Sequence, residues 1–280
     1  MDIPQIQYEP LVRAALLEDI GPGDITTMLC VPAGTTATAT VPAKQPGVIA
    51  GLAIAELAFK LLDPNAHWEA FVKDGARVGD GRTPLAVVTG DARALLTAER
   101  VALNFLQRLS GIATLTAHYV RLTAGTQARI VDTRKTTPGL RALEKYAVRA
   151  GGGFNHRLGL YDCVLIKDNH IKAAGGIGNA VAGAKAQIPH TMKIEVETAT
   201  LGMVEEALHA GADIILLDNM DTETMRRAVE LIGGRAISEA SGGLTEARVA
   251  EVAATGVDVL SIGALTHSAP ALDISLDFAG

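Results

Sequence analysis

The sequence predicts an α/β protein in which an incomplete (β/α) barrel follows a smaller α+β domain. The second half of the chain carries a regular series of short apolar runs with helical patterns between them. Polar or glycine residues follow most of these runs, whereas the first hundred residues have a different, β-rich texture. At 280 residues the chain exceeds the usual size of one domain, which agrees with a barrel that carries an appendage.

The amino-terminal part predicts a helix followed by a small sheet. Apolar residues from Tyr8 to Ile20 have helical spacing, and Gly21-Pro22-Gly23 ends the pattern. Residues 35–90 contain short β-rich stretches separated by Gly, Pro and Asp, and a second helix is expected from Leu52 to Leu62. We therefore expect a small α+β domain with an antiparallel sheet.

A long helical pattern follows at residues 97–123, and we expect Gly111 to break it into two helices. The domain boundary is placed at this glycine. The predicted domains are residues 1–110, a catalytic barrel at 111–268, and a tail at 269–280 that returns to the first domain.

The barrel prediction depends on six apolar runs, at residues 128–135, 162–170, 192–198, 213–220, 236–243 and 257–263. Continuous apolar runs indicate strands that are buried on both faces, and a barrel would direct their polar downstream ends toward one mouth. Six strands are fewer than eight, so an incomplete barrel is preferred. An open doubly wound sheet is the alternative, although no G-x-G-x-x-G follows a strand.

Composition excludes several classes of protein. A hydrophobic share of 48% with 20% charged residues is typical of a compact globular chain. A net charge of -6 argues against nucleic acid or an anionic membrane as partner. Cys30 and Cys163 belong to no disulfide or zinc pattern, and neither an export signal nor a membrane span is recognisable. A cytoplasmic location is expected.

The charge balance reverses between Arg134 and Lys172, a segment that contains eight Lys and Arg residues but only three Asp and Glu residues. The cations at predicted strand ends or after the triple glycine at 151–153 are Arg134, Lys135, His156, Arg157 and Lys167. Their convergence would bind a small polyanion, because Arg forks pair with carboxylates or phosphates. The alternative is a solvated basic face paired with Glu144, Asp162 and Asp168. A Schiff-base role for Lys167 is a further alternative.

Carboxylates and glycines are expected at the same mouth. Glu197 and Asp218 end neighbouring strands, where they could bind ribose hydroxyls, a divalent cation, or the nearby cations as structural salt bridges. Ser241-Gly242-Gly243 and Gly263 follow late strands, where barrels commonly bind phosphate, although ordinary turns would have the same composition. Among the histidines His156 stands out, then His170, and the role of His267 is left open.

Four segments make the sequence resemble a known family: residues 98–114 and 132–171, the motif LLDNM and the motif EASGG. They closely resemble quinolinate phosphoribosyltransferase, the carboxylating nicotinate-nucleotide pyrophosphorylase. The resemblance implies an α/β sandwich domain, an incomplete barrel, and a homodimer with shared active sites; assembly beyond the dimer stays open. The implied reaction joins quinolinate to 5-phosphoribosyl 1-diphosphate with Mg2+, giving nicotinate mononucleotide, diphosphate and CO2 for NAD biosynthesis.

The resemblance also implies residue roles. Arg134, His156 and Arg157 would bind the quinolinate carboxylates, and Arg100 would reach in from the other subunit. Lys135 and Lys167 would serve both substrates, with Thr133 as a backbone contributor. Glu197 and Asp218 would contact the ribose and, indirectly or in part, the metal. Ser241, Gly242, Gly243 and Gly263 would hold the 5-phosphate, and the implied catalytic residues are Lys135, Lys167, Glu197 and Asp218.

Three other functions remain as alternatives. One is the molybdenum-associated paralogue of the same fold, against which the intact GGGFNHR and IKDNH segments argue. Another is the phosphoribosyltransferase that uses nicotinate, although two carboxylate-binding sets suit a diacid better. The third is a catalytically silent barrel that binds a sugar phosphate, which would tolerate loss of Glu197 and Asp218.

Overall fold

The computed structural model describes residues 3–279, which form two compact units. Unit 1 contains the chain up to Ala117, Thr136–Gly152, and the chain from Leu265 onward. Unit 2 contains His118–Lys135 and Gly153–Ala264. Within the described residues, no helix combines the length and the apolar character needed to cross a membrane.

Unit 1 is built around an antiparallel sheet with the strand order β12-β1-β5-β3. Its strands are β1 (Thr36–Ala43), β3 (His67–Ala70), β5 (Thr83–Asp91) and β12 (Asp277–Phe278), and β2 (Gly47–Val48) pairs separately with β4 (Arg77–Val78). Its helices are α1 (Gln5–Ile20), α2 (Ile25–Cys30), α3 (Leu52–Leu62) and α5 (Arg141–Ala150), together with most of α4 (Ala92–Leu122). The carboxyl-terminal strand β12 extends this sheet by pairing with β1.

Local signals explain most of these elements. Helix α3 has the predicted bounds, and α1 ends at Gly21, whose φ of 51° is a conformation that glycine adopts easily. Helix α1 begins at Gln5, earlier than the predicted Tyr8. The short helix α2 was not predicted; the Asp24 side chain caps it by accepting the Thr27 N–H at 3.0 Å.

The predicted break at Gly111 is wrong, because α4 runs without interruption from Ala92 to Leu122. Gly111 instead provides room for the carboxyl-terminal segment. A Cβ at this position would lie 1.9 Å from the carbonyl oxygen of Pro270. The glycine therefore reflects close packing within unit 1 and not the end of a helix.

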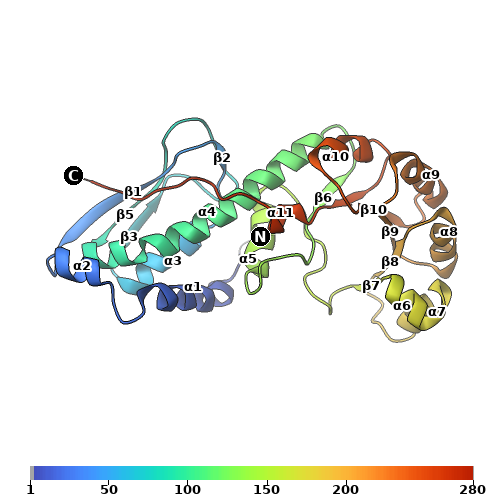
Figure 1. Ribbon diagram of the computed structural model, residues 1–280, viewed down its shortest axis with the longest axis horizontal. Coiled ribbons are helices and arrows are strands. Elements are labelled where there is room, and N and C mark those ends of the chain that lie inside the picture. Colours follow the sequence, from blue (N-terminus) through green and yellow to red (C-terminus); the bar gives the residue numbers. More distant parts are fainter. Residues whose placement is uncertain (1–2, 280) are drawn as a thin grey trace. The chain divides into compact units, whose positions relative to one another are not determined.

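Unit 2 contains a six-stranded parallel sheet with the order β6-β11-β10-β9-β8-β7. The strands are β6 (Arg129–Val131), β7 (Val164–Ile166), β8 (Ile194–Thr198), β9 (Ile214–Asp218), β10 (Ile237–Ser241) and β11 (Val259–Ser261). The helices are α6 (Asp168–Ala174), α7 (Ile177–Lys185), α8 (Leu201–Ala210), α9 (Thr222–Ile232) and α10 (Glu246–Ala253), and α11 (Ala264–His267) follows β11. Helices α8 and α9 lie outside strands β8 and β9 (Figure 1).

The sheet is an incomplete barrel, as predicted, with each of its strands inside a predicted apolar run. The first two strands in the chain, β6 and β7, form the two edges of the sheet and do not pair with each other. Phe154 lies in this gap and forms a parallel bridge with Val131 of β6. Buried residues such as Val196, Ile215 and Leu217 fill the strands, which explains their nearly continuous apolar sequence.

Candidate active site

A cavity of about 480 Å³ opens at the carboxyl ends of the unit 2 strands. Eleven residues that were singled out from the sequence line it: Thr133, Arg134, Lys135, His156, Arg157, Lys167, Glu197, Asp218, Ser241, Gly242 and Gly243. They come from loops that follow different strands, and the parallel sheet brings them together because all of its strands end on one side. Sequence positions more than a hundred residues apart thus form one site.

The cations occupy the part of the cavity contributed by β6, β7 and the segment between them. Lys135 follows a turn in which its N–H donates to the Thr133 hydroxyl at 3.0 Å. Arg157 donates from Nη1 to the carbonyl oxygen of Cys163 at 3.2 Å, which directs the arginine across the segment before β7. Lys167 directly follows β7. Such a group of cations can bind an anion that carries several charges.

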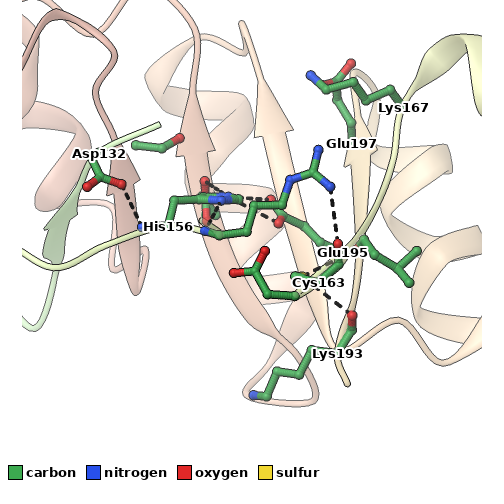
Figure 2. A network of polar contacts seen from close by, with 12 residues as sticks. Asp132, His156, Cys163, Lys167, Lys193, Glu195 and Glu197 are labelled. Atoms are coloured by element: carbon green, nitrogen blue, oxygen red, sulfur yellow. Dashed lines mark hydrogen bonds and ion pairs between the residues drawn. The ribbon is translucent and has the colours of Figure 1, made fainter. Parts of the chain in front are cut away.

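Two carboxylates face the cations. Glu197 forms an ion pair with Lys167, with 2.8 Å between Nζ and Oε2, and the two side chains lie side by side in Figure 2. Asp218, at the end of β9, accepts a hydrogen bond from Asn219 Nδ2 at 2.8 Å. Carboxylate oxygens at a cavity mouth are the donors that Mg2+ prefers, usually with substrate phosphates completing the shell. Glu197 and Asp218 therefore fit a magnesium ion bound together with a substrate.

The glycine-rich loop after β10 packs closely against Asn219. Gly242 has a φ of 89°, and a Cβ there would lie 2.2 Å from Asn219 Oδ1. Asn219 itself has a φ of 54°, and its N–H donates to the Ser241 carbonyl at 3.0 Å. Asn is one of the few non-glycine residues that adopt this conformation readily, and the close approach of Asn219 leaves no room for a side chain at position 242. Asn219 was not predicted, although it directly follows Asp218 in LLDNM.

A buried cluster lies beneath the cations. His156 Nε2 is 3.2 Å from Glu195 Oε2 and 3.3 Å from Glu239 Oε1. Its Nδ1 accepts the main-chain N–H of Arg157 at 2.7 Å. Figure 2 shows His156 pointing toward Glu195. Both ring nitrogens of His156 are thus engaged by the protein.

Glu195 and Glu239 were not predicted from the sequence, and Glu239 also lines the cavity. The signal was present, because each glutamate precedes a predicted site residue by two positions, Glu197 and Ser241 respectively. Side chains two apart on a strand point to the same side. The glutamates therefore share the side of the barrel on which the site lies, one layer further from the mouth.

The pKa values of His156 and Glu195 are both raised in this cluster. Desolvation lowers the pKa of His156, but the hydrogen bonds and charges of Glu195 and Glu239 outweigh it and raise the pKa to about 10. Burial, followed by the charge of Glu239, raises the pKa of Glu195, while the hydrogen bond from His156 opposes this rise. The folded cluster therefore holds a proton that the same groups would release in the unfolded chain at neutral pH.

The three side chains of this cluster are also the one His and Glu group among residues 3–279 whose donor atoms lie close enough to bind a metal ion, within 4.8 Å of one another. The carboxylates already pair with Nε2, and Nδ1 is occupied by a main-chain N–H. The arrangement is therefore a self-contained ion-pair cluster.

Several predicted residues lie elsewhere. Arg100 is exposed on α4 in unit 1, and Gly263 follows β11 but is not among the residues that line the cavity. His170 accepts the Lys167 N–H at 2.9 Å at the start of α6. Among the carboxylates considered as partners of a solvated basic face, Glu144 pairs with Arg108, outside the basic segment, whereas Asp168 pairs with Lys172, the last cation of that segment.

Comparison with known proteins gives a consistent result. Two family models match the chain: the quinolinate phosphoribosyl transferase N-terminal domain at residues 24–110 and its C-terminal domain at residues 112–277. The chain is 47% identical to a probable carboxylating nicotinate-nucleotide pyrophosphorylase of Bacillus subtilis, over 97% of this chain and 93% of that protein. It is also 47% identical to the carboxylating nicotinate-nucleotide pyrophosphorylase of Mycobacterium leprae, over 95% of each.

Solved structures agree with these matches. The crystal structure of NadC from Streptococcus pyogenes aligns over 100% of both chains with a TM-score of 0.95 and 42% identity. The nicotinate-nucleotide pyrophosphorylase of Francisella tularensis aligns over 99% of this chain and 98% of that chain, with a TM-score of 0.95 and 40% identity.

Proposed function

The chain belongs to the quinolinate phosphoribosyltransferase family, enzymes of NAD biosynthesis, and from this premise we propose the reaction of its cavity and the role of each residue. The reaction transfers the phosphoribosyl group of 5-phosphoribosyl 1-diphosphate to quinolinate, and releases diphosphate and CO2 to give nicotinate mononucleotide. The observation that carries this proposal is the cavity whose lining combines four Lys and Arg side chains with three carboxylates, those of Glu197, Asp218 and Glu239.

The cations suit the acceptor, which carries two carboxylates. Arg134 and Arg157 would bind these groups, because the planar guanidinium matches a carboxylate. His156 lines the cavity, and because both of its ring nitrogens are engaged by the protein it would act as a support beside the arginines. Lys135 and Lys167 would lie between the acceptor and the diphosphate of the donor.

The carboxylates suit the donor. When diphosphate leaves, positive charge develops at C1 of the ribose, and Glu197 and Asp218 would stabilise that charge and bind the ribose hydroxyls. Mg2+, held by oxygens of Glu197 and Asp218 together with the donor diphosphate, would neutralise charge on the leaving group. Ser241, Gly242 and Gly243 would hold the 5-phosphate through main-chain N–H groups, together with Gly263, and Thr133 would contribute a main-chain group.

Loss of the 2-carboxylate needs no protein nucleophile. Once the pyridine nitrogen has attacked the ribose, it carries positive charge, and the electron pair of the breaking C2–carboxylate bond remains at C2 beside it. The carbon then takes up a proton as CO2 leaves. The ionic side chains that line the cavity support this chemistry.

The protein is also proposed to act as a cytoplasmic homodimer. Helices α1 and α2 expose five large apolar side chains, Ile6, Leu17, Ile25, Met28 and Leu29, with exposed fractions of 60–82%. Such a patch is typical of a subunit interface. Arg100 would complete the active site of the partner. The two free cysteines suit a reducing compartment.

The proposal is tested by incubating the purified protein with quinolinate, 5-phosphoribosyl 1-diphosphate and Mg2+, while CO2 and nicotinate mononucleotide are measured together. We expect both products in equal amounts, none with nicotinate as acceptor, and none when a chelator removes the metal. Folded protein that forms no product from quinolinate would contradict the proposal.

A further inference from the structure

The segment at residues 153–157 closes the open side of the barrel between β6 and β7. The Phe154 N–H donates to the Ile130 carbonyl at 2.8 Å, and the Asp132 N–H donates to the Phe154 carbonyl at 3.3 Å. The Asp132 carboxylate accepts the His156 N–H at 2.9 Å and Asn155 Nδ2 at 2.6 Å. The segment is therefore attached to β6 through main-chain and side-chain bonds.

His156 attaches the same segment to the opposite strands. Its ring reaches Glu195 of β8 and Glu239 of β10, both of which are buried (Figure 2 shows the pair formed with Glu195). Glu239 Oε1 is a buried oxygen that lies 3.3 Å from His156 Nε2. Burial of a carboxylate oxygen is costly unless a donor lies beside it, and the Nε2 proton of His156 can be that donor.

Arg157 depends on the same ring. Its main-chain N–H donates to His156 Nδ1 at 2.7 Å, and its guanidinium donates to the Cys163 carbonyl at 3.2 Å. Arg157 also lines the cavity. The imidazole and the main chain of Arg157 thus hold each other in place.

We propose that Glu239 is a positioning residue: together with Glu195 it holds the Nε2 proton of His156, and the fixed ring sets Arg157 at the cavity. The inference rests on the proposed function, in which Arg157 binds a carboxylate of the acceptor.

Charged and titratable groups approach His156 from three strands of unit 2. Glu195 approaches from β8, Glu239 from β10, and Asp132 from the end of β6 through the main-chain N–H. Arg157 and Cys163 lie on the adjoining segment. Both glutamates lie close to Nε2, at 3.2 and 3.3 Å, so removal of one of them should lower the proton affinity of His156.

Two substitutions separate the parts of the proposal. Glu239→Leu removes both the charge and the acceptor at similar volume, and we expect it to raise the KM for quinolinate at least about tenfold, while the KM for 5-phosphoribosyl 1-diphosphate stays within about threefold. Glu239→Gln retains an acceptor of the same shape and should restore the KM for quinolinate to within about threefold of the original enzyme. Glu205→Gln, an exposed site on α8, is the matched control and should change neither constant.

The link through Arg157 is tested by a double-mutant cycle. If Glu239 acts through Arg157, Glu239→Leu should have little further effect on the KM for quinolinate in an Arg157→Ala background. An undiminished effect in that background would overturn the proposal. Equal changes in the KM values of both substrates would also overturn it, because general disruption of the cavity has that result.

A measurement without turnover tests the link to His156. The ¹⁵N NMR titration of His156, assigned with a His156→Gln variant, should have its midpoint lowered by about 1 to 3 units in both Glu239 variants. An unchanged midpoint would overturn the proposal, as would one bound transition-metal ion per chain that Glu239→Leu removes. Because this titration needs no substrate, it remains valid even if the protein fails to use quinolinate.

Discussion

Lys167 connects the two kinds of charge in the cavity. It directly follows β7, pairs with Glu197 across the neighbouring strand, and retains an exposed fraction of 49%. An ion pair that is this exposed contributes little to stability, about 0–1 kcal/mol. The arrangement is therefore better explained by the binding and stabilisation of charged substrates than by folding.

Lys167→Ala should consequently lower kcat/KM by about 10²–10³-fold, because the variant removes a cation beside the developing charge of the leaving group. Its melting temperature should stay close to that of the original protein. Lys172→Ala, which breaks the exposed pair with Asp168 on α6, is the control and should be almost fully active. Activity of Lys167→Ala within about tenfold of the original would remove this lysine from the reaction.

At the scale of single elements, each strand of unit 2 brings polar residues to the cavity while its apolar residues remain buried. Strand β8 contains both layers, since Glu197 lies at the mouth and Glu195 lies below it. Strand β10 repeats the pattern, since Ser241 lies at the end of the strand and Glu239 lies two residues before it, deeper in the cavity. In unit 1 the long helix α4 has a different constraint, because Gly111 must accommodate the main chain at Pro270.

Gly111→Ala should therefore destabilise the protein although alanine favours helices. Its Cβ would lie 1.9 Å from a main-chain oxygen that cannot simply rotate away, and we expect a loss of at least about 1–3 kcal/mol. Gly183→Ala in α7 is the matched control, because nothing lies within 4 Å of its Cβ position, and it should stabilise the helix by about 0.5–1 kcal/mol. Chemical denaturation of both variants tests this contrast, and equal effects would contradict it.

The whole molecule should respond to pH through the buried cluster. The folded pKa of His156, about 10, lies above its ordinary value of 6.5, so its contribution to stability is complete below pH 6.5 and is lost as the pH rises toward 10. Burial also raises the pKa of Cys163, to about 11 from 9.0, which adds a loss of the same sign above pH 9. The window between pH 6.5 and 9 therefore isolates the cluster.

We expect the free energy of unfolding, measured in denaturant at one protein concentration, to fall between pH 6.5 and 9. In Glu239→Gln the fall should be shallower, since a lower folded pKa leaves a smaller difference from the unfolded chain. Equal slopes in the two proteins would show that another group causes the dependence.

The proposed dimer gives a second prediction at this scale. Arg100→Ala and Lys135→Ala should each be inactive, whereas an equal mixture after subunit exchange should recover about a quarter of full activity, because half the dimers carry one intact site of two. Size-exclusion chromatography with differently tagged subunits verifies the exchange. If exchanged dimers remain inactive, the sites are not shared.

Much of the fold followed from local patterns in the sequence. The six barrel strands lie within apolar runs, because a strand buried on both faces needs apolar residues at almost every position. The residues at their downstream ends could be grouped before the structure was known, since parallel strands end on the same side. The helix at Leu52–Leu62 was likewise predictable from its spacing.

Only the tertiary structure decided the rest. Gly111 has the local signature of a helix break, but the helix continues because another segment packs against the glycine. Glu195 and Glu239 are ordinary glutamates in the sequence, and their role depends on a histidine about 40 and 80 residues away that crosses the barrel interior to meet them. Sequence patterns report the spacing within one element, whereas proton affinity and close packing depend on contacts between elements.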